Sequence, residues 1–263
     1  MSTAVAPTAL YRALSQEQID EFACRGFITI GSILDTPLIE ELRNEYDRLF
    51  AEARQNGRFR NLSVSDTEDL AEKNEADEQM LQIMQVCERS MHFRQLLYDA
   101  RILDIAEDLI GPNIQLFHDQ ALFKPARHGG AVFWHQDNAY WKCVPAKLVS
   151  CWLTLDDVDA TNGAMHLIPG SHLNPLDHDR SAQTSALLDI GDRIDQDQAE
   201  IIDLPAGGAL FHHCQTLHHT PPNHTERQRR AFVIHFMPPG TRSAHSGELL
   251  GVSFGRPILR MCI

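Results

Sequence analysis

The half of the chain that follows Pro112 consists of short apolar or alternating segments, and no other feature restricts the fold as strongly. Glycine, proline and asparagine separate these segments. Alternation with a period of two is typical of strands that bury one face. Seven or eight such strands predict a double-stranded β-helix, a jelly roll of the cupin kind, and Gly207-Gly208 predicts a hairpin between two of them. The predicted strands are 115–124, 131–135, 148–155, 164–168, 200–204, 209–213 and 231–237.

The first third of the chain shows helical spacing instead. Ser15 and Gln18 have the pattern of a capping box, and Pro37 stands near the start of a second helix. The expected helices are 15–26, 35–53, 80–97 and 102–110, with a strand at 27–30. This gives a mainly β fold with flanking α-helices that cover one sheet. A single domain is expected over 1–263, with an N-terminal arm (1–14), a mainly helical part (15–111) and the jelly-roll core (112–263).

Composition excludes several classes of protein. The formal net charge of −13 disfavours binders of nucleic acid or anionic membranes, because both need clustered cations. No run of 18 apolar residues predicts a membrane-spanning helix, and the N-terminus lacks the pattern of a signal peptide. The six cysteines form no Cys-x-x-Cys pair, which is typical of reduced thiols in a cytoplasmic protein rather than of zinc ligands. The expected partner is a small-molecule substrate.

The triplet His135-Gln136-Asp137 points to metal chemistry. In an extended segment, residues two apart share a face, so this imidazole and this carboxylate can aim at one point. A second histidine would complete a set that holds Fe(II) and leaves coordination positions open. The triplet alone is weak in a chain with 14 histidines, and His224-Thr225-Glu226 is of the same type. A strand-end histidine that is hydrogen-bonded to its neighbour is the simpler alternative.

Residues 205–238 contain six histidines, most of which are expected to end strands or face solvent. Here the sequence resembles the phytanoyl-CoA dioxygenase family of Fe(II)- and 2-oxoglutarate-dependent oxygenases. Residues 216–223 match the family pattern T-L-H-G-S-x-x-N around His218, with His219 for glycine and Thr220 for serine. Arg229 follows at the family's offset of eleven residues. Further matching stretches are 111–114, 123–125, 151–155, 163–172 and 255–260, so the resemblance runs from about Leu14 to the end.

The resemblance implies that His135, Asp137 and His218 bind Fe(II), and that 2-oxoglutarate and O2 are co-substrates. Arg229 is expected to pair with the distal carboxylate of 2-oxoglutarate, because a guanidinium offers two parallel hydrogen bonds. Arg227 and Arg230 are competitors, although Arg230 should face the other way on a strand.

The resemblance also assigns neighbours of the cosubstrate. Thr220 takes the role of the family's serine, and Trp152 and Gln120 align with residues that line the cosubstrate pocket, although core packing explains both equally well. Tyr140 and Trp141 follow the triplet directly and are candidates for the substrate side. The weaker candidates are Lys124, expected to be an exposed and solvated lysine, and Gln85.

The implied reaction is hydroxylation of an aliphatic C–H of a small organic molecule, in natural-product or acyl metabolism. Related halogenases carry a small residue where this chain has Asp137, so the carboxylate favours hydroxylation over halogenation. Desaturation, ring closure or epimerisation would use the same cofactors and stay open as outcomes. Two alternatives stay open, a cupin-type metal enzyme without 2-oxoglutarate and a non-catalytic barrel that binds a ligand. The polar segments 58–79 and 173–198 are expected to form a mobile cover over the site or to be surface loops without a role.

Overall fold

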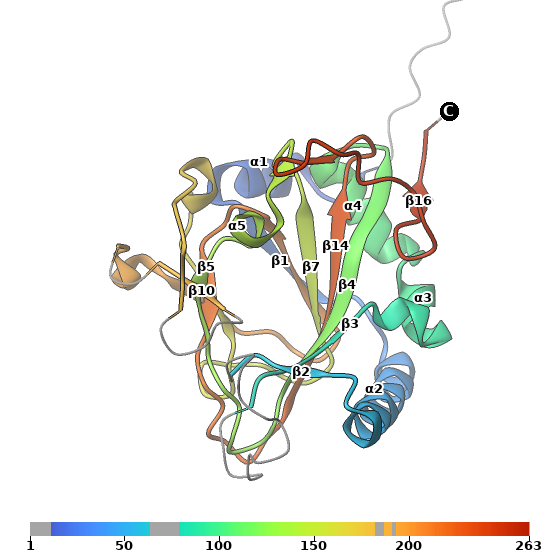
Figure 1. Ribbon diagram of the computed structural model, residues 1–263, viewed down its shortest axis with the longest axis vertical. Coiled ribbons are helices and arrows are strands. Elements are labelled where there is room, and N and C mark those ends of the chain that lie inside the picture. The colour runs from blue at the N-terminus through green and yellow to red at the C-terminus, as the bar shows by residue number, and fades with distance from the viewer. Residues whose placement is uncertain (1–11, 64–78, 182–186, 191–192, 263) are drawn as a thin grey trace, which may run out of the picture.

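Two antiparallel sheets lie opposite each other in the computed structural model, which describes residues 12–63, 79–181, 187–190 and 193–262 (Figure 1). The large sheet has the order β1-β12-β7-β14-β4-β3-β2, with β16 paired to β4, and the small sheet has the order β11-β8-β13-β5. This arrangement is the predicted double-stranded β-helix.

The large sheet contains β1 (Phe27–Ser32), β2 (Arg60–Asn61), β3 (Leu81–Met84), β4 (Ile114–Lys124), β7 (Val149–Thr154), β12 (Gly208–His213), β14 (Arg229–Met237) and β16 (Ile258–Arg260). The small sheet contains β5 (Val132–His135), β8 (Met165–Leu167), β11 (Glu200–Ile202) and β13 (His218–Thr220). Two short ribbons pair β6 (Cys143–Val144) with β15 (Arg242–Ser243), and β9 (Asp179–Arg180) with β10 (Leu188–Asp189).

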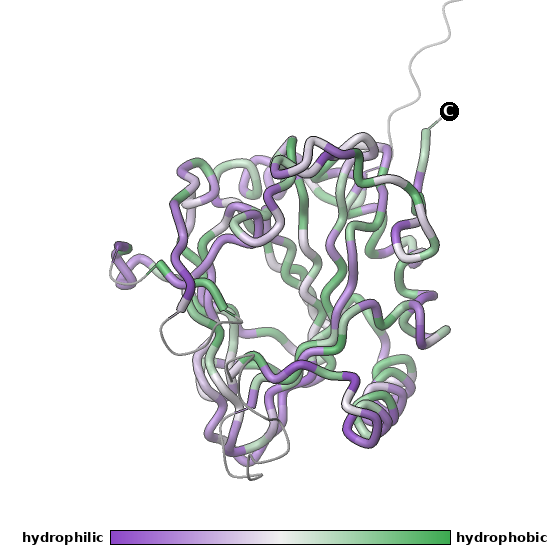
Figure 2. Tube along the Cα trace, in the orientation of Figure 1, coloured by the Kyte–Doolittle hydropathy of each residue, from purple (hydrophilic) through white to green (hydrophobic). Residues whose placement is uncertain are grey.

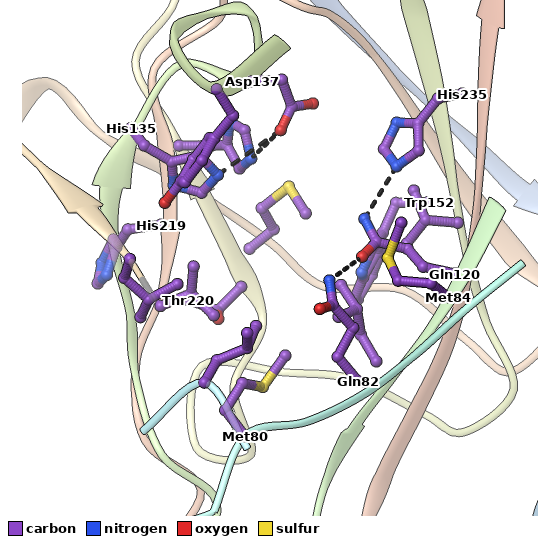
Figure 3. A pocket seen from close by; sticks show the side chains of 18 of the residues that line it. Met80, Gln82, Met84, Gln120, His135, Asp137, Trp152, His219, Thr220 and His235 are labelled. Carbon is purple, nitrogen blue, oxygen red and sulfur yellow. Dashed lines mark hydrogen bonds and ion pairs between the residues drawn. The ribbon is translucent and has the colours of Figure 1, made fainter. Parts of the chain in front are cut away.

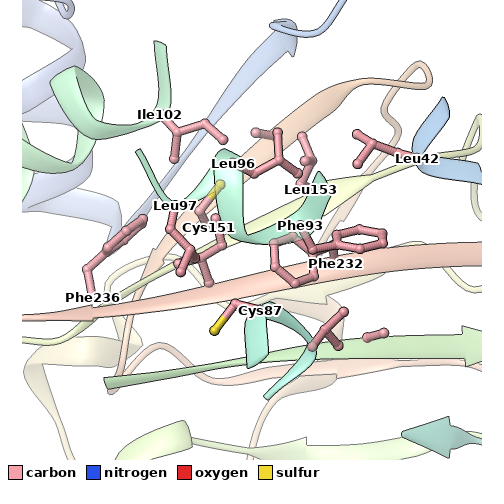
Figure 4. Packing of buried hydrophobic residues seen from close by; sticks show 14 of the residues in the cluster. Leu42, Cys87, Phe93, Leu96, Leu97, Ile102, Cys151, Leu153, Phe232 and Phe236 are labelled. Atoms are coloured by element: carbon pink, nitrogen blue, oxygen red, sulfur yellow. The ribbon is translucent and has the colours of Figure 1, made fainter. Parts of the chain in front are cut away.

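The large sheet has two different faces because side chains alternate along each strand. On β7, Val149, Cys151 and Leu153 belong to the largest apolar cluster, whereas Ser150 and Trp152 point toward the small sheet. Strands β12 and β14 repeat this pattern. Figure 4 shows Phe232 of β14 packed against Phe93, which lies in a helix. The face that turns toward the small sheet is therefore free to carry polar side chains.

Helices cover the outer face of the large sheet (Figure 1). The first, α1 (Gln16–Arg25), begins at the predicted capping box, where Ser15 Oγ accepts from the Gln18 amide at 3.2 Å. It ends at Gly26, whose φ of 84° suits glycine. The second, α2 (Thr36–Asn56), is capped by Asp35, and Figure 2 shows its mixture of hydrophobic and hydrophilic residues. The other helices are α3 (Met91–Leu96), α4 (Ala100–Ile110) and α5 (Asp137–Trp141), with 3-10 turns at Val86–Glu88, Ser171–Leu173 and Gln196–Gln198. No helix within the described residues is long and apolar enough to cross a membrane.

The helix expected at 80–97 is wrong over its first part. Residues Leu81–Met84 form β3, and the helix α3 begins only at Met91. Leu81 and Ile83 are buried and alternate with Gln82 and Met84, so the segment can bury one face as a strand. Pairing with β4 favours the strand over the helix. The ladder gives the backbone groups of this segment hydrogen-bond partners, whereas a short helix without tertiary contacts is only marginally stable.

The hairpin expected at Gly207-Gly208 is also wrong. Strand β11 belongs to the small sheet and β12 to the large one, so the chain crosses between the sheets at this point. Gly207 has a φ of 78°, and its amide donates to the Thr154 carbonyl at 2.8 Å. The long insertion 173–198 contains the β9–β10 ribbon and a 3-10 turn in its described part.

Candidate metal centre

A cavity of about 290 Å³ lies between the two sheets (Figure 3). The large sheet contributes side chains from β2, β3, β4, β7, β12 and β14, and the small sheet contributes side chains from β5, β8 and β13. The cavity therefore collects residues that are far apart in the sequence. Such a cavity is large enough for a small ligand and contains most of the polar residues that the sequence singles out.

His135, Asp137 and His218 form one buried group at the cavity wall, with ligand atoms within 4.8 Å of one another. The two histidines are direct partners in the ladder between β5 and β13. Gln136 is extended, with φ −112° and ψ 129°, so Asp137 shares the face of His135 although it begins the short helix α5. Asp137 Oδ1 lies 3.6 Å from His135 Nε2 and 3.8 Å from His218 Nε2.

Backbone carbonyls fix the orientation of both imidazoles. His135 Nδ1 lies 2.7 Å from the Phe133 carbonyl, and His218 Nδ1 lies 2.9 Å from the Thr216 carbonyl. A carbonyl only accepts, so each Nδ1–H donates and each Nε2 keeps its lone pair. Burial lowers the pKa of His218 well below its usual value, which favours the neutral form that binds metal.

Asp137 is ionised in this setting. Burial would raise the pKa of Asp137, but the surrounding imidazoles of His135, His218 and His212 together lower that pKa well below its ordinary range. A buried carboxylate beside two neutral imidazoles is the donor set that suits Fe(II). The residues therefore fit a ferrous ion.

Arg229 is 1% exposed and lines the same cavity. Its Nη1 donates to the Leu122 carbonyl at 3.3 Å, but Nε and Nη2 are buried and without a hydrogen-bond partner. Burial lowers the pKa of Arg229 to about 10. The Oγ1 of Thr220 is also buried without a partner, and Trp152 lies beneath the guanidinium at 5.6 Å. Unpaired buried donors need an acceptor, and the distal carboxylate of 2-oxoglutarate would supply one.

The two competing arginines are already paired. Arg230 binds Asp156 at 2.7 Å and Asp47 at 3.0 Å on the helix side of the sheet. Arg227 is exposed and pairs with Asp159 at 2.6 Å. Neither of them lines the cavity. The alternation along β14 separates Arg229 from Arg230, as expected for a strand.

Three further candidates line the cavity, namely Gln120, Tyr140 and Trp141. The Tyr140 hydroxyl accepts from the Leu188 amide at 2.6 Å, and burial raises the pKa of Tyr140 to about 12. The Trp141 ring meets the His235 ring edge-on at 4.7 Å. Tyr140 and Trp141 are therefore placed to contact a ligand from the α5 side.

Lys124 and Gln85 are outside the described lining of the cavity. The expected exposed lysine is wrong, because Lys124 is fully buried and its Nζ donates to the carbonyls of Gly130 and Thr220 at 2.7 and 3.2 Å, and to that of Pro221. Its charge is satisfied by backbone oxygens. Gln85 is exposed, has a φ of 55° and donates to Glu88 at 3.0 Å.

Sequence reasoning missed several polar residues of the cavity. Gln82, His118, His212 and His235 line it, and Ser150 donates to Asp137 Oδ2 at 3.1 Å. Alternation along the predicted strand 231–237 could have placed His235 on the same face as Arg229. Alternation along the predicted strand 115–124 could likewise have placed His118 on the same face as Gln120.

His219, which replaces the family's glycine, lies within β13 and is absent from the positive-φ residues. Its ring packs on Trp134 at 4.5 Å and meets His166 at 4.6 Å. His219 therefore needs no left-handed backbone, although the pairing of β13 with β5 shifts register between His218 and Thr220. Of the two segments expected to cover the site, residues 64–78, 182–186 and 191–192 lie outside the described residues, whereas Arg60, Leu62 and Leu187 line the cavity.

Comparison with known proteins gives concordant results. A family model described as phytanoyl-CoA dioxygenase (PhyH) matches residues 22–231. A protein of Stutzerimonas stutzeri named "Probable alpha-ketoglutarate-dependent hypophosphite dioxygenase" is 32% identical over 162 residues. That match covers 59% of this chain and 54% of the relative, so it spans about half of the relative's length.

Solved structures share the fold. The non-heme alpha-ketoglutarate-dependent carbocyclase SnoK from nogalamycin biosynthesis aligns with a TM-score of 0.74 at 19% identity, over 95% of this chain and 98% of that one. EvdO2 from Micromonospora carbonacea, complexed with 2-oxoglutarate, aligns with a TM-score of 0.64 at 29% identity, over 89% and 95% of the two chains. The jelly-roll architecture is thus common to all three.

Proposed function

This chain belongs to the phytanoyl-CoA dioxygenase family, and on that premise we propose that it is an Fe(II)- and 2-oxoglutarate-dependent dioxygenase that hydroxylates an aliphatic C–H of a small organic molecule. One observation carries the proposal. A group of two histidines and one carboxylate shares a cavity with a buried arginine whose Nε and Nη2 have no partner. A metal enzyme that does not use 2-oxoglutarate would leave that arginine unexplained.

His135, Asp137 and His218 would hold Fe(II), which supplies the redox chemistry of O2 and 2-oxoglutarate when bound. Arg229 and Thr220 would hold the distal carboxylate, and Trp152 forms a rigid wall beneath the guanidinium. The apolar walls exclude water from the reacting groups, which limits unproductive turnover. Metal, cosubstrate and substrate thus have separate positions in one cavity.

The experiment that tests the proposal measures two properties of the purified protein. Anaerobic addition of 2-oxoglutarate to the Fe(II) form should produce a charge-transfer absorption band, and addition of O2 should release succinate. An enzyme that binds Fe(II) but neither binds nor consumes 2-oxoglutarate would instead be a cupin-type metal enzyme of another class. Product analysis with an identified substrate would distinguish hydroxylation from desaturation, ring closure or epimerisation.

We further propose that residues 1–263 form one domain and that the protein functions in the cytoplasm. Support for one domain is the largest apolar cluster, which combines residues from the helices and from the large sheet. Support for the compartment is that all six cysteines are free thiols.

A further inference from the structure

A continuous chain of four hydrogen bonds connects the cavity wall with the metal carboxylate, and Figure 3 shows the first two, from Gln82 to Gln120 and from Gln120 to His235. Gln82 Nε2 lies 2.5 Å from Gln120 Oε1, and Gln120 Nε2 lies 2.9 Å from His235 Nε2. His235 Nδ1 lies 2.7 Å from Ser150 Oγ, which lies 3.1 Å from Asp137 Oδ2. The five side chains come from β3, β4, β14, β7 and α5.

The direction of this chain follows from Asp137. A carboxylate only accepts, so the Ser150 hydroxyl donates to it and uses its single proton. His235 Nδ1–H must then donate to Ser150, and in a neutral ring Nε2 is left as an acceptor. Gln120 must therefore present its NH2 group to His235 and its carbonyl oxygen to Gln82.

The same logic leaves one atom without a partner. Gln82 donates its NH2 group to Gln120, so its own carbonyl oxygen remains, and that Oε1 is buried with no hydrogen bond. Gln82 lines the cavity, and Figure 3 shows its amide end pointing into it. A buried amide oxygen is costly unless a donor reaches it. The distal carboxylate of the cosubstrate only accepts hydrogen bonds, so it cannot donate to Gln82 Oε1.

The charges of the cavity favour a neutral donor. Among the described lining residues Asp137 is the sole carboxylate, and it is a metal ligand, whereas Arg60 and Arg229 are cations. An ammonium group would enter this positive environment without a counterion. Apolar side chains line the same cavity as Gln82, and they include Leu62, Met80, Met84, Leu122 and Leu187.

We propose, on the basis of the proposed function, that the substrate is an aliphatic molecule with a neutral hydroxyl or amide N–H that donates to Gln82 Oε1. This donor completes a series of hydrogen bonds in which every group donates toward Asp137. Gln82 is then a specificity-determining residue. Ser150 and His235 are positioning residues that hold the carboxylate oxygen not turned toward the histidine ligands.

The first test compares donors with isosteres that lack the donor. Secondary amides are paired with the matching esters, and alcohols with the matching fluorides, and each compound is assayed for stimulated succinate release. At least one donor should exceed its isostere in kcat/KM by roughly tenfold or more, because the isostere leaves Gln82 unsatisfied. Gln82→Leu should bring that ratio close to one, while Met84→Leu, on the same strand and wall, should preserve it.

The outcomes separate the inference from the proposed function. If no donor in the panel exceeds its isostere, or if Gln82→Leu keeps the ratio, the inference is overturned even though 2-oxoglutarate binds and is consumed. If the Fe(II) form does not bind 2-oxoglutarate at all, the proposed function itself fails. The ratio is internal to each variant, so a general loss of activity does not affect it.

The second test determines the direction of these hydrogen bonds without turnover, from the tautomer of His235. In Zn(II)-loaded wild-type protein with 15N-labelled histidine, His235 should show the Nδ1–H tautomer. Ser150→Ala removes the acceptor of that proton and should shift His235 toward Nε2–H. An Nε2–H tautomer in the wild-type protein would reverse the order of donors and overturn the inference.

Discussion

Replacement of Arg229 by methionine separates two effects of this arginine. One is the free energy that its buried charge costs the folded protein, and the other is its contribution to 2-oxoglutarate binding. The guanidinium is 1% exposed and has one hydrogen bond, to the Leu122 carbonyl. A pKa of about 10, against an ordinary 12.5, corresponds to roughly 3 kcal/mol lost by the charged form through burial. A carboxylate that pairs with Nε and Nη2 would recover this energy on binding.

We therefore expect opposite effects on binding and on stability. The dissociation constant of 2-oxoglutarate should rise by roughly 10²- to 10³-fold, which corresponds to about 3–4 kcal/mol. The protein without ligands should unfold at the same or a higher temperature, because methionine fills similar space without a buried charge. Fe(II) should still bind, since Arg229 is not one of the metal ligands.

The assay is an anaerobic titration of the Fe(II) protein with 2-oxoglutarate, followed by absorption, together with thermal unfolding with and without 2-oxoglutarate. Arg227→Ala is the matched control, because Arg227 is exposed and pairs with Asp159 outside the cavity. An unchanged dissociation constant in Arg229→Met, or a larger effect from Arg227→Ala, would refute the reasoning.

Four further outcomes are expected. His218→Ala should abolish turnover and strongly weaken Fe(II) binding in equilibrium dialysis, and retained activity would refute its role as the distal ligand. Thr220→Val should raise the 2-oxoglutarate constant by roughly tenfold, and Thr220→Ser should restore it, as measured by the same titration. Lys124→Met should cost about 2–5 kcal/mol of unfolding free energy in urea, because buried carbonyls lose their donor. Burial, with His172 and His212 nearby, lowers the pKa of His213 to about 4, so stability should fall as the pH drops from 6.5 to 4, and His213→Gln should flatten that decline in pH-dependent urea unfolding.

The sequence by itself predicted the features that depend on local spacing. Alternation after Pro112 predicted the strands of the double-stranded β-helix, and capping residues predicted the first helices. His135 and Asp137 share a face because only one extended residue separates them. Arg229 and Arg230 face opposite sides because adjacent residues alternate along a strand. Such relations are fixed by backbone geometry within a few residues.

Tertiary structure decided what depends on pairing between distant strands. The β3–β4 ladder converted an expected helix into a strand and thereby placed Gln82 beside Gln120. The crossing at Gly207 separated an expected hairpin into two sheets. The burial of Lys124 depends on carbonyls of three residues, distant in the sequence, that converge on its amino group. Hydrogen bonds between side chains on different strands depend on register, and register is set by long-range packing that no local pattern contains.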